Sequence, residues 1–189
     1  MGLLSCHEMR ELERQAFRKG ISAESLMDKA GKRLGEALVD LYSGPGTAVA
    51  YVGKGNNGGD ALVALRVLRS AGWKVVVRSA FQPLEFGALP RQKLRELGDI
   101  EVQRHRWELE RSQGPLLLLD GLLGIGANGP LREPIGSLAA EMNALRESGG
   151  AEIVAIDVPS GVNADDGRVE DGAVQADLTA TIAVPKKGL

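Results

Sequence analysis

The sequence predicts one doubly wound α/β domain with an N-terminal helical arm. After residue 46, short strands that are apolar on both faces alternate with helical stretches. This pattern is typical of a parallel sheet that is covered on both sides. Polar loops follow three of those strands, at the edge of the sheet where ligands bind in such folds. With 189 residues and 43% hydrophobic residues, the chain is long enough to build one sizeable core.

The helical arm is predicted at residues 1–42. Ser5-Cys6-His7-Glu8 has the spacing of a capping box, and the helix that it starts is expected to end near Gly20. Leucines at helical spacing predict a second helix. Within it, Gly31 and Gly35 permit close approach to another element.

The α/β core is predicted at residues 47–189, within a single domain that spans residues 1–189. Its strands are expected at Ala48–Val52, Lys74–Arg78, Ile100–Val102, Leu116–Leu119, Glu152–Ile156 and Leu178–Val184. Its helices are expected at Asp60–Ala71, at Pro90–Leu97, and from about Ile135 to a stop at Gly149-Gly150.

Composition narrows the class of function. A net charge of −2 without a basic run argues against binding to nucleic acid. The single cysteine, Cys6, excludes an internal disulfide and is expected to serve in packing. No apolar run is long enough to cross a bilayer, and the first residues are too few for a signal peptide. We therefore expect a cytoplasmic protein that does not bind membranes.

Three polar loops are expected to meet at the carboxyl edge of the sheet: Gly53–Asp60, Asp120–Pro130 and Asp157–Gly161. Their glycines let the backbone approach a ligand, and the start of the following helix offers free N–H groups. Two loops begin with an aspartate directly after an apolar strand. Either aspartate alone is often only a cap, but two that converge with a Gly/Asn loop predict a ligand site.

The same loops suggest a cation site. Asn57, Asp120 and Ser160 would offer oxygen ligands around one negative charge. That set suits a monovalent cation better than a divalent one, which usually recruits more carboxylates. The alternative is that Asn57 and Ser160 hydrogen-bond only their own loops.

A second ligand class stays open. Gly53, Gly55 and Gly58 satisfy G-x-G-x-x-G between a strand and a helix. The usual acidic residue after the next strand is absent, and Arg78 stands near that point, where an arginine can bind the 2′-phosphate of NADP. An NADP-dependent dehydrogenase is therefore an alternative, although Asp60 in the first helical turn would repel a pyrophosphate.

Four motifs, in this order, resemble the YjeF N-terminal family, which is the family of NAD(P)H-hydrate epimerases. They are Gly53–Asp60, Asp120–Gly126, Asp157–Gly167 and Ala176–Thr179. The resemblance covers nearly the whole chain and implies a Rossmann-like three-layer α/β/α sandwich. It also implies an isomerase for nicotinamide nucleotide repair, which interconverts the R and S forms of hydrated NADH and NADPH (NADHX and NADPHX).

The resemblance also implies a set of site residues and partners. The implied substrate-binding residues are Asn56, Asn57, Gly58, Gly59, Asp60, Gly124, Ile125, Gly126, Ala127, Asn128, Gly129, Pro130 and Asp157. One potassium ion (K+) per subunit would be held by Asn57, Asp120 and Ser160. A homodimer is a further implication, as is an ATP- or ADP-dependent NAD(P)HX dehydratase as functional partner.

Asp120 is the predicted acid–base group. The hydrate is a hemiaminal, so inverting its hydroxyl-bearing carbon requires either loss and return of the hydroxyl or opening of the ring. Both routes need a proton delivered to oxygen or nitrogen and later returned. Burial and the nearby Asp157 would raise the pKa of Asp120, whereas a neighbouring cation would lower it.

The chain departs from the family pattern at Gly121 and Ile125, and it stops at Pro185–Leu189, where the family's domain usually continues. We therefore expect a short or missing last element of the sheet. A non-catalytic nucleotide-binding or dimerisation module of the same fold is the remaining alternative. The presence of Asp60 together with the two strand-end aspartates favours the enzyme.

Overall fold

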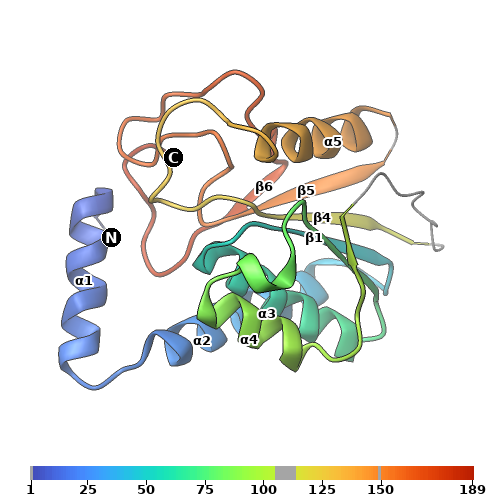
Figure 1. Cartoon of the computed structure of the whole chain (residues 1–189), viewed down its shortest axis with the longest axis horizontal. Coiled ribbons are helices and arrows are strands. Elements are labelled where there is room, and N and C mark those ends of the chain that lie inside the picture. Colours follow the sequence, from blue (N-terminus) through green and yellow to red (C-terminus); the bar gives the residue numbers. More distant parts are fainter. Residues whose placement is uncertain (1, 105–113, 149) are drawn as a thin grey trace.

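The computed structural model describes residues 2–104, 114–148 and 150–189. It has the predicted three-layer architecture, in which helices cover both faces of a six-stranded sheet (Figure 1). The strands are β1 (Thr47–Val52), β2 (Lys74–Arg78), β3 (Val102–Gln103), β4 (Leu116–Gly121), β5 (Ala151–Ile156) and β6 (Leu178–Ala180). Each strand pairs in parallel with its neighbours, in the order β3-β2-β1-β4-β5-β6.

The helices fall on two sides of this sheet. They are α1 (Cys6–Arg18), α2 (Ala23–Leu41), α3 (Asn56–Ser70), α4 (Ala88–Glu96) and α5 (Ile135–Glu147), with a short 3-10 helix, η1 (Pro83–Glu85). Helices α2, α3 and α4 lie on one side and α5 on the other (Figure 1). Alternate residues of β1 enter the two cores: Ala48 and Ala50 face α3, whereas Val49 and Tyr51 face α5. Both faces of β1 are thus buried, as predicted for the strands of this sheet.

Helix α1 stands beside the sandwich, and its first turn is fixed to the end of the chain (Figure 1). The predicted capping box is present: the Ser5 hydroxyl accepts from the Glu8 N–H, and the Glu8 carboxylate accepts from the Ser5 N–H at 2.8 Å. Leu4 pairs with Lys186 in an isolated bridge. Cys6 is buried in a small apolar cluster, as expected for a packing role.

Helix α2 packs on α3 and belongs to the helical layer of the sandwich. Of the two helices predicted for the arm, only α1 therefore lies outside the layers of the sandwich. A Cβ added at Gly31 would lie 2.5 Å from the Cβ of Val63, and one at Gly35 would lie 2.6 Å from the Cβ of Val67. No side chain fits at these distances, so the two glycines permit the close approach that the sequence predicted.

Helix α3 begins at Asn56, four residues earlier than predicted, so the Asn-Asn-Gly-Gly-Asp stretch forms helical turns and not a loop. Glycine disfavours helix, which is why the sequence placed the start at Asp60. Packing overrides this preference. A Cβ at Gly58 would lie 2.7 Å from the Gly53 carbonyl oxygen, and one at Gly59 would lie 2.5 Å from the sulfur of Met27.

The order of strands changes direction between β1 and β4, since β1 leads to β2 on one side and β4 leads to β5 on the other. In such sheets this switch point opens a crevice beyond the carboxyl ends of the strands. The loops after β1 and β4 meet there: the Gly53 N–H donates to the Gly121 carbonyl at 3.1 Å. A Cβ at Gly53 would lie 1.9 Å from the Leu122 carbonyl oxygen, so this contact requires glycine.

Candidate active site

A cleft of about 570 Å³ lies at the carboxyl edge of the sheet. This volume is within the range of about 300–1,000 Å³ that is usual for small-molecule sites. Residues of α1, of the start of α3, and of the segments after β2, β4, β5 and β6 form its walls. They are Met9, Arg10, Glu13, Lys54, Gly55, Asn56, Asn57, Asp60, Phe81, Leu122, Leu123, Gly124, Ile125, Gly126, Ala127, Ile135, Asp157 and Ile182.

Most of the predicted substrate-binding residues line this cleft. Those that do are Asn56, Asn57, Asp60, Gly124, Ile125, Gly126, Ala127 and Asp157. Gly58 and Gly59 are buried in α3 behind the wall, where they permit its packing. Asn128 and Gly129 line a separate small pocket instead, and Pro130 is exposed and lines neither hollow.

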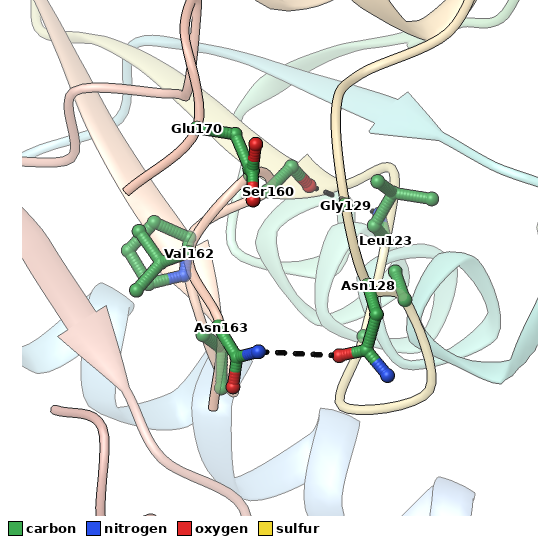
Figure 2. Close-up of a pocket in the computed structure, with 12 residues that line it drawn as sticks. Leu123, Asn128, Gly129, Ser160, Val162, Asn163 and Glu170 are labelled. Atoms are coloured by element: carbon green, nitrogen blue, oxygen red, sulfur yellow. Dashed lines mark hydrogen bonds between the residues drawn. The ribbon is translucent and has the colours of Figure 1, made fainter. Parts of the chain in front are cut away.

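The small pocket separates the loop after β4 from the segment after β5, and its volume is about 10 Å³. That is space for about one water molecule. Figure 2 shows Asn128 and Asn163 facing each other across it; their amides are 3.5 Å apart, at the limit of a hydrogen bond. Ser160 also lies on its wall. The loop after β4 is therefore contacted from both sides, by α3 and by the segment after β5.

Asp120 is part of β4 and is completely buried. Its Oδ2 accepts from the Ser160 N–H at 2.7 Å, and its Oδ1 accepts from the Ser160 hydroxyl at 2.7 Å and from the Leu122 N–H at 3.2 Å. Burial raises the pKa of Asp120 to about 6, against the opposing effect of the Ser160 hydrogen bonds. All of these donors are neutral groups.

The three predicted ion ligands are connected through Leu123. The Asn57 amide donates to the Leu123 carbonyl at 2.6 Å, and the Leu123 N–H donates to the Ser160 hydroxyl at 3.0 Å. That hydroxyl in turn donates to Asp120. Asn57 and Ser160 thus bond the loop after β4 and not only their own loops, contrary to the alternative. The structure brings Asn57, Asp120 and Ser160 into one hydrogen-bonded chain.

Asp120 does not line the cleft. It lies beneath the residues that follow β4, and Leu122, the first of these, is itself 3% exposed. Proton transfer needs the acid–base group within hydrogen-bond reach of the reacting atom, directly or through one water. In this position Asp120 holds the floor of the cleft, and its acid–base role stays a prediction.

Asp157 lines the cleft and forms an ion pair with a buried lysine. Its Oδ1 accepts from the Lys186 ammonium and from the Ile182 N–H at 2.9 Å. The Lys186 side chain has no exposed area, and it also donates to the Ile182 carbonyl at 2.8 Å. Lys186 was not predicted as a site residue, because two adjacent lysines in a sequence suggest an exposed segment. Only burial distinguishes Lys186 from its exposed neighbour Lys187.

Asp60 and Glu13 bring two more carboxyl groups to the same cleft. Asp60 is 9% exposed. Burial and the charges of Asp157 and Glu13 raise its pKa well above the usual range, while Lys186 opposes the rise. Burial and Asp157 likewise raise the pKa of Glu13, opposed by Lys186 and Arg10. Glu13 lies on α1, and nothing in the sequence indicated that α1 would form a wall of the site.

A second cleft, of about 600 Å³, opens between α1, α2 and the segment after β6. The residues that line both clefts are Met9, Glu13, Asn56, Asp60 and Ile182. Asp60 therefore stands at the junction of two hollows, each large enough for part of an extended ligand.

Arg78, the residue on which the NADP-dehydrogenase alternative rested, is not available to a ligand. It is 5% exposed. Its Nε and Nη2 donate to the two carboxylate oxygens of Glu141 at 2.8 and 2.7 Å, and its Nη1 donates to the Gln103 carbonyl at 2.9 Å. Arg78 is therefore a structural residue beneath α5. It cannot bind the 2′-phosphate of NADP in this arrangement, so Arg78 gives no support to the dehydrogenase alternative.

The described part of the chain contains neither a cluster of metal-binding side chains nor a helix able to cross a membrane. No cluster of three or more histidine, cysteine, aspartate or glutamate side chains is arranged to hold a metal ion within residues 2–104, 114–148 and 150–189. None of the helices described above has the length and apolarity that crossing a membrane requires.

The parallel sheet, the loops that meet at its switch point and the cleft between them define a Rossmann-like domain with a ligand site at its carboxyl edge. The chain belongs to the family described as YjeF-related protein N-terminus, whose profile matches residues 23–188. This confirms the resemblance seen in the sequence motifs.

Named relatives cover nearly the whole chain. An NAD(P)H-hydrate epimerase of Rhodopirellula baltica is 33% identical over 98% of this chain and 76% of its own length. A bifunctional NAD(P)H-hydrate repair enzyme, Nnr, of Coxiella burnetii is 36% identical over 96% of this chain and 36% of its own length. The chain thus spans about a third of the bifunctional relatives it matches.

The fold also matches a solved structure. The crystal structure of the yeast protein ynu0 superposes with a TM-score of 0.80, at 20% sequence identity, over all of this chain and 83% of that one. The likeness supports the three-layer architecture described above.

Proposed function

We propose that this chain is an NAD(P)H-hydrate epimerase, an isomerase that interconverts the R and S forms of NADHX and NADPHX. The proposal rests on the epimerase relative, which aligns with 98% of the chain. The cleft supports it, because the motif residues Asn56, Asp60 and Asp157 line one hollow at the switch point.

The reaction needs a group that can hold a proton near the ligand. Inversion of the hemiaminal carbon requires a proton at the hydroxyl oxygen or at the ring nitrogen, and its later return. Among the residues described, the carboxyl groups that line the cleft are Glu13, Asp60 and Asp157. The apolar side chains of Met9, Phe81 and Leu122 line the same cleft and would help to exclude water.

We also propose a potassium site at Asn57, Asp120 and Ser160. Among the residues described, only neutral donors meet the fully buried carboxylate of Asp120, so a cation beside it would find an uncompensated charge. One carboxylate with amide and hydroxyl oxygens suits a monovalent ion. When bound, K+ would supply one positive charge that ties α3 to the loops after β4 and β5.

The ion proposal has a test that does not depend on activity. The melting temperature is measured in potassium chloride and in tetramethylammonium chloride at equal ionic strength, for the wild type and for Ser160→Ala. Potassium should raise the melting temperature of the wild type, and it should raise that of the variant much less. Equal melting temperatures of the wild type in the two salts would contradict the site.

Partners and setting follow from the proposed reaction. An ATP- or ADP-dependent NAD(P)HX dehydratase would consume one epimer and thus act as functional partner. A homodimer and a cytoplasmic location stay predictions from the sequence. Sedimentation velocity tests the first, and fractionation of cells tests the second.

A coupled assay tests the function. An S-specific ATP-dependent dehydratase consumes its epimer from a mixed NADHX pool until the absorbance of NADH stops rising, and the protein is then added. A resumed rise, absent with heat-denatured protein, is expected. A rate no faster than the spontaneous one would contradict the proposal and favour the non-catalytic module.

A further inference from the structure

The ion pair between Lys186 and Asp157 is unusual for its burial. The side chain of Lys186 has no exposed area, and that of Asp157 is 11% exposed. A buried ammonium is costly unless it is paired and hydrogen-bonded. Lys186 meets this requirement through the Asp157 carboxylate and the Ile182 carbonyl. The proposed function so far gives Lys186 no role.

The Asp157 carboxylate is fixed in its orientation. Its backbone has φ = 70°, in the left-handed region that non-glycine residues seldom adopt. The surrounding structure must hold such a conformation in place. Here the Asp157 N–H donates to the Ala180 carbonyl at 2.9 Å, and the carboxylate accepts from the Ile182 N–H and from Lys186.

Asp60 lines the same cleft but, unlike Asp157, its carboxyl group has no protein partner among the described residues. It is 9% exposed, and no hydrogen bond or ion pair joins its carboxyl group to any residue within the described ranges. The carboxyl group of Asp60 is therefore free to bond a ligand that enters the cleft. Asp60 lines both clefts and therefore faces any ligand that extends across them.

We propose that Lys186 is a positioning residue of the epimerase site: it holds Asp157 as an oriented carboxylate, and it leaves Asp60 as the carboxyl group that gives a proton to the substrate hydroxyl. The inference rests on the proposed function and deepens it. It moves the acid–base role from Asp120, beneath the floor, to a pair of aspartates in the cleft wall.

The step balances without a co-reactant. The Asp60 proton goes to the hydroxyl oxygen, the C–O bond breaks and water leaves, while the nitrogen lone pair forms a C=N bond. The negative charge of Asp157 stabilises the positive charge that develops on the ring. Water then adds to the other face, the C=N electrons return to nitrogen, and the proton of that water returns to Asp60.

The charged groups around this pair come from three segments of the chain. They are Arg10 and Glu13 of α1, Lys54 before α3, and Lys186 after β6. Glu13 and Asp157 raise the pKa of Asp60, and Lys186 lowers it. Removal of Lys186 should therefore raise the pKa of Asp60 further, and it would leave the Asp157 carboxylate without its cation.

The first experiment compares Lys186→Met with Lys187→Met. The adjacent Lys187 is exposed and pairs with Glu8, so it serves as a matched control for the loss of one charge. We expect Lys186→Met to lower kcat about tenfold or more and to shift the basic limb of the kcat profile, which reports loss of the Asp60 proton, to higher pH, with a smaller change in KM. Lys187→Met should behave as the wild type. An unshifted profile with normal kcat in folded Lys186→Met would overturn the inference.

A double variant separates positioning from folding. Lys186→Met leaves Asp157 buried without its counter-charge and is prone to unfold. Asp157→Asn with Lys186→Met removes both charges, so the double variant should be folded by circular dichroism and still turn over slowly. Wild-type kcat in the double variant would show that the pair is only structural. Lys186→Arg, which keeps the cation, should recover part of the wild-type pH profile.

A spectroscopic readout works whatever the activity. At neutral pH the infrared spectrum of the wild type should contain the C=O band of a protonated carboxyl group. Asp60→Asn should remove this band, and Lys186→Met should alter it. If no such band is lost, the assignment of the proton to Asp60 is wrong. A wild type that fails the coupled assay contradicts the proposed function instead, so the two failures are distinguishable.

Discussion

Asp120 and Asp157 follow neighbouring apolar strands and look alike in the sequence, but their partners differ. Asp120 is completely buried, and within the described residues it accepts hydrogen bonds only from neutral groups. Asp157 borders the cleft and accepts from the Lys186 ammonium. The comparison teaches that an aspartate at the end of a strand marks the place of a site, whereas its partners decide what it does there.

The largest expected effect is on stability, from Asp157→Asn. This change leaves the Lys186 ammonium buried without a counter-charge, and breaking a buried pair in this way typically costs about 3–5 kcal/mol. Urea unfolding followed by circular dichroism measures it. The exposed Asp171 offers the control, since Asp171→Asn should change the free energy of unfolding very little. A loss as small as that of the control would mean that the pair contributes nothing to folding.

Asp120→Asn should cost less, about 1–3 kcal/mol, because its partners are neutral and at most one donor is left without an acceptor. The same urea unfolding measures this difference. If Asp120→Asn lowered the free energy of unfolding as much as Asp157→Asn, the contrast between the two aspartates would be wrong, because Asp120 would then also compensate a buried charge.

Ser160→Ala should cost about 1 kcal/mol or somewhat more, because the hydroxyl both donates to Asp120 and accepts from the Leu123 N–H. Thermal unfolding without potassium isolates this contribution. Ser137, whose hydroxyl bonds Glu133 at the surface, gives the control variant Ser137→Ala, for which the change should be smaller. Equal changes in the two variants would contradict the role of Ser160 as a buried link.

The smallest expected effect concerns an exposed carboxylate, Glu8. Hydrogen bonds from the Ser5 N–H and hydroxyl, together with Lys187, lower the pKa of Glu8 to about 2. A lowered pKa stabilises the fold above about pH 4.5, and this contribution is lost as the pH falls towards 2. Glu8→Gln should therefore lower the melting temperature slightly at pH 7 and not at pH 2. The same difference at both pH values would contradict this account.

The sequence predicted the architecture well, because each strand is apolar on both faces and glycines mark the close approaches. It placed Gly31 and Gly35 against another element, which is where α2 meets α3. It misplaced the start of α3, because the low helix propensity of Gly58 and Gly59 is overridden by packing that only the folded chain shows.

The site was predicted in part. The three strand-end loops were expected to meet, and they do, but whether Asp120 faces the cleft or lies beneath it depends on the path of Leu122 and Leu123. Glu13 and Lys186 were missed, because both come from segments whose approach to the cleft is set by tertiary contacts. No spacing in the sequence links Lys186 to Asp157, which is 29 residues away.

The bridge between Leu4 and Lys186 has a consequence for local motion. The Leu4 N–H donates to the Pro185 carbonyl, and the Lys187 N–H donates to the Leu4 carbonyl. The start of the chain therefore holds the segment that carries Lys186, and neither can open alone. Their amides should exchange with solvent deuterium at matching rates, as one cooperative unit. Removal of the first four residues would then speed exchange in the wall of the cleft, far along the sequence from the cut.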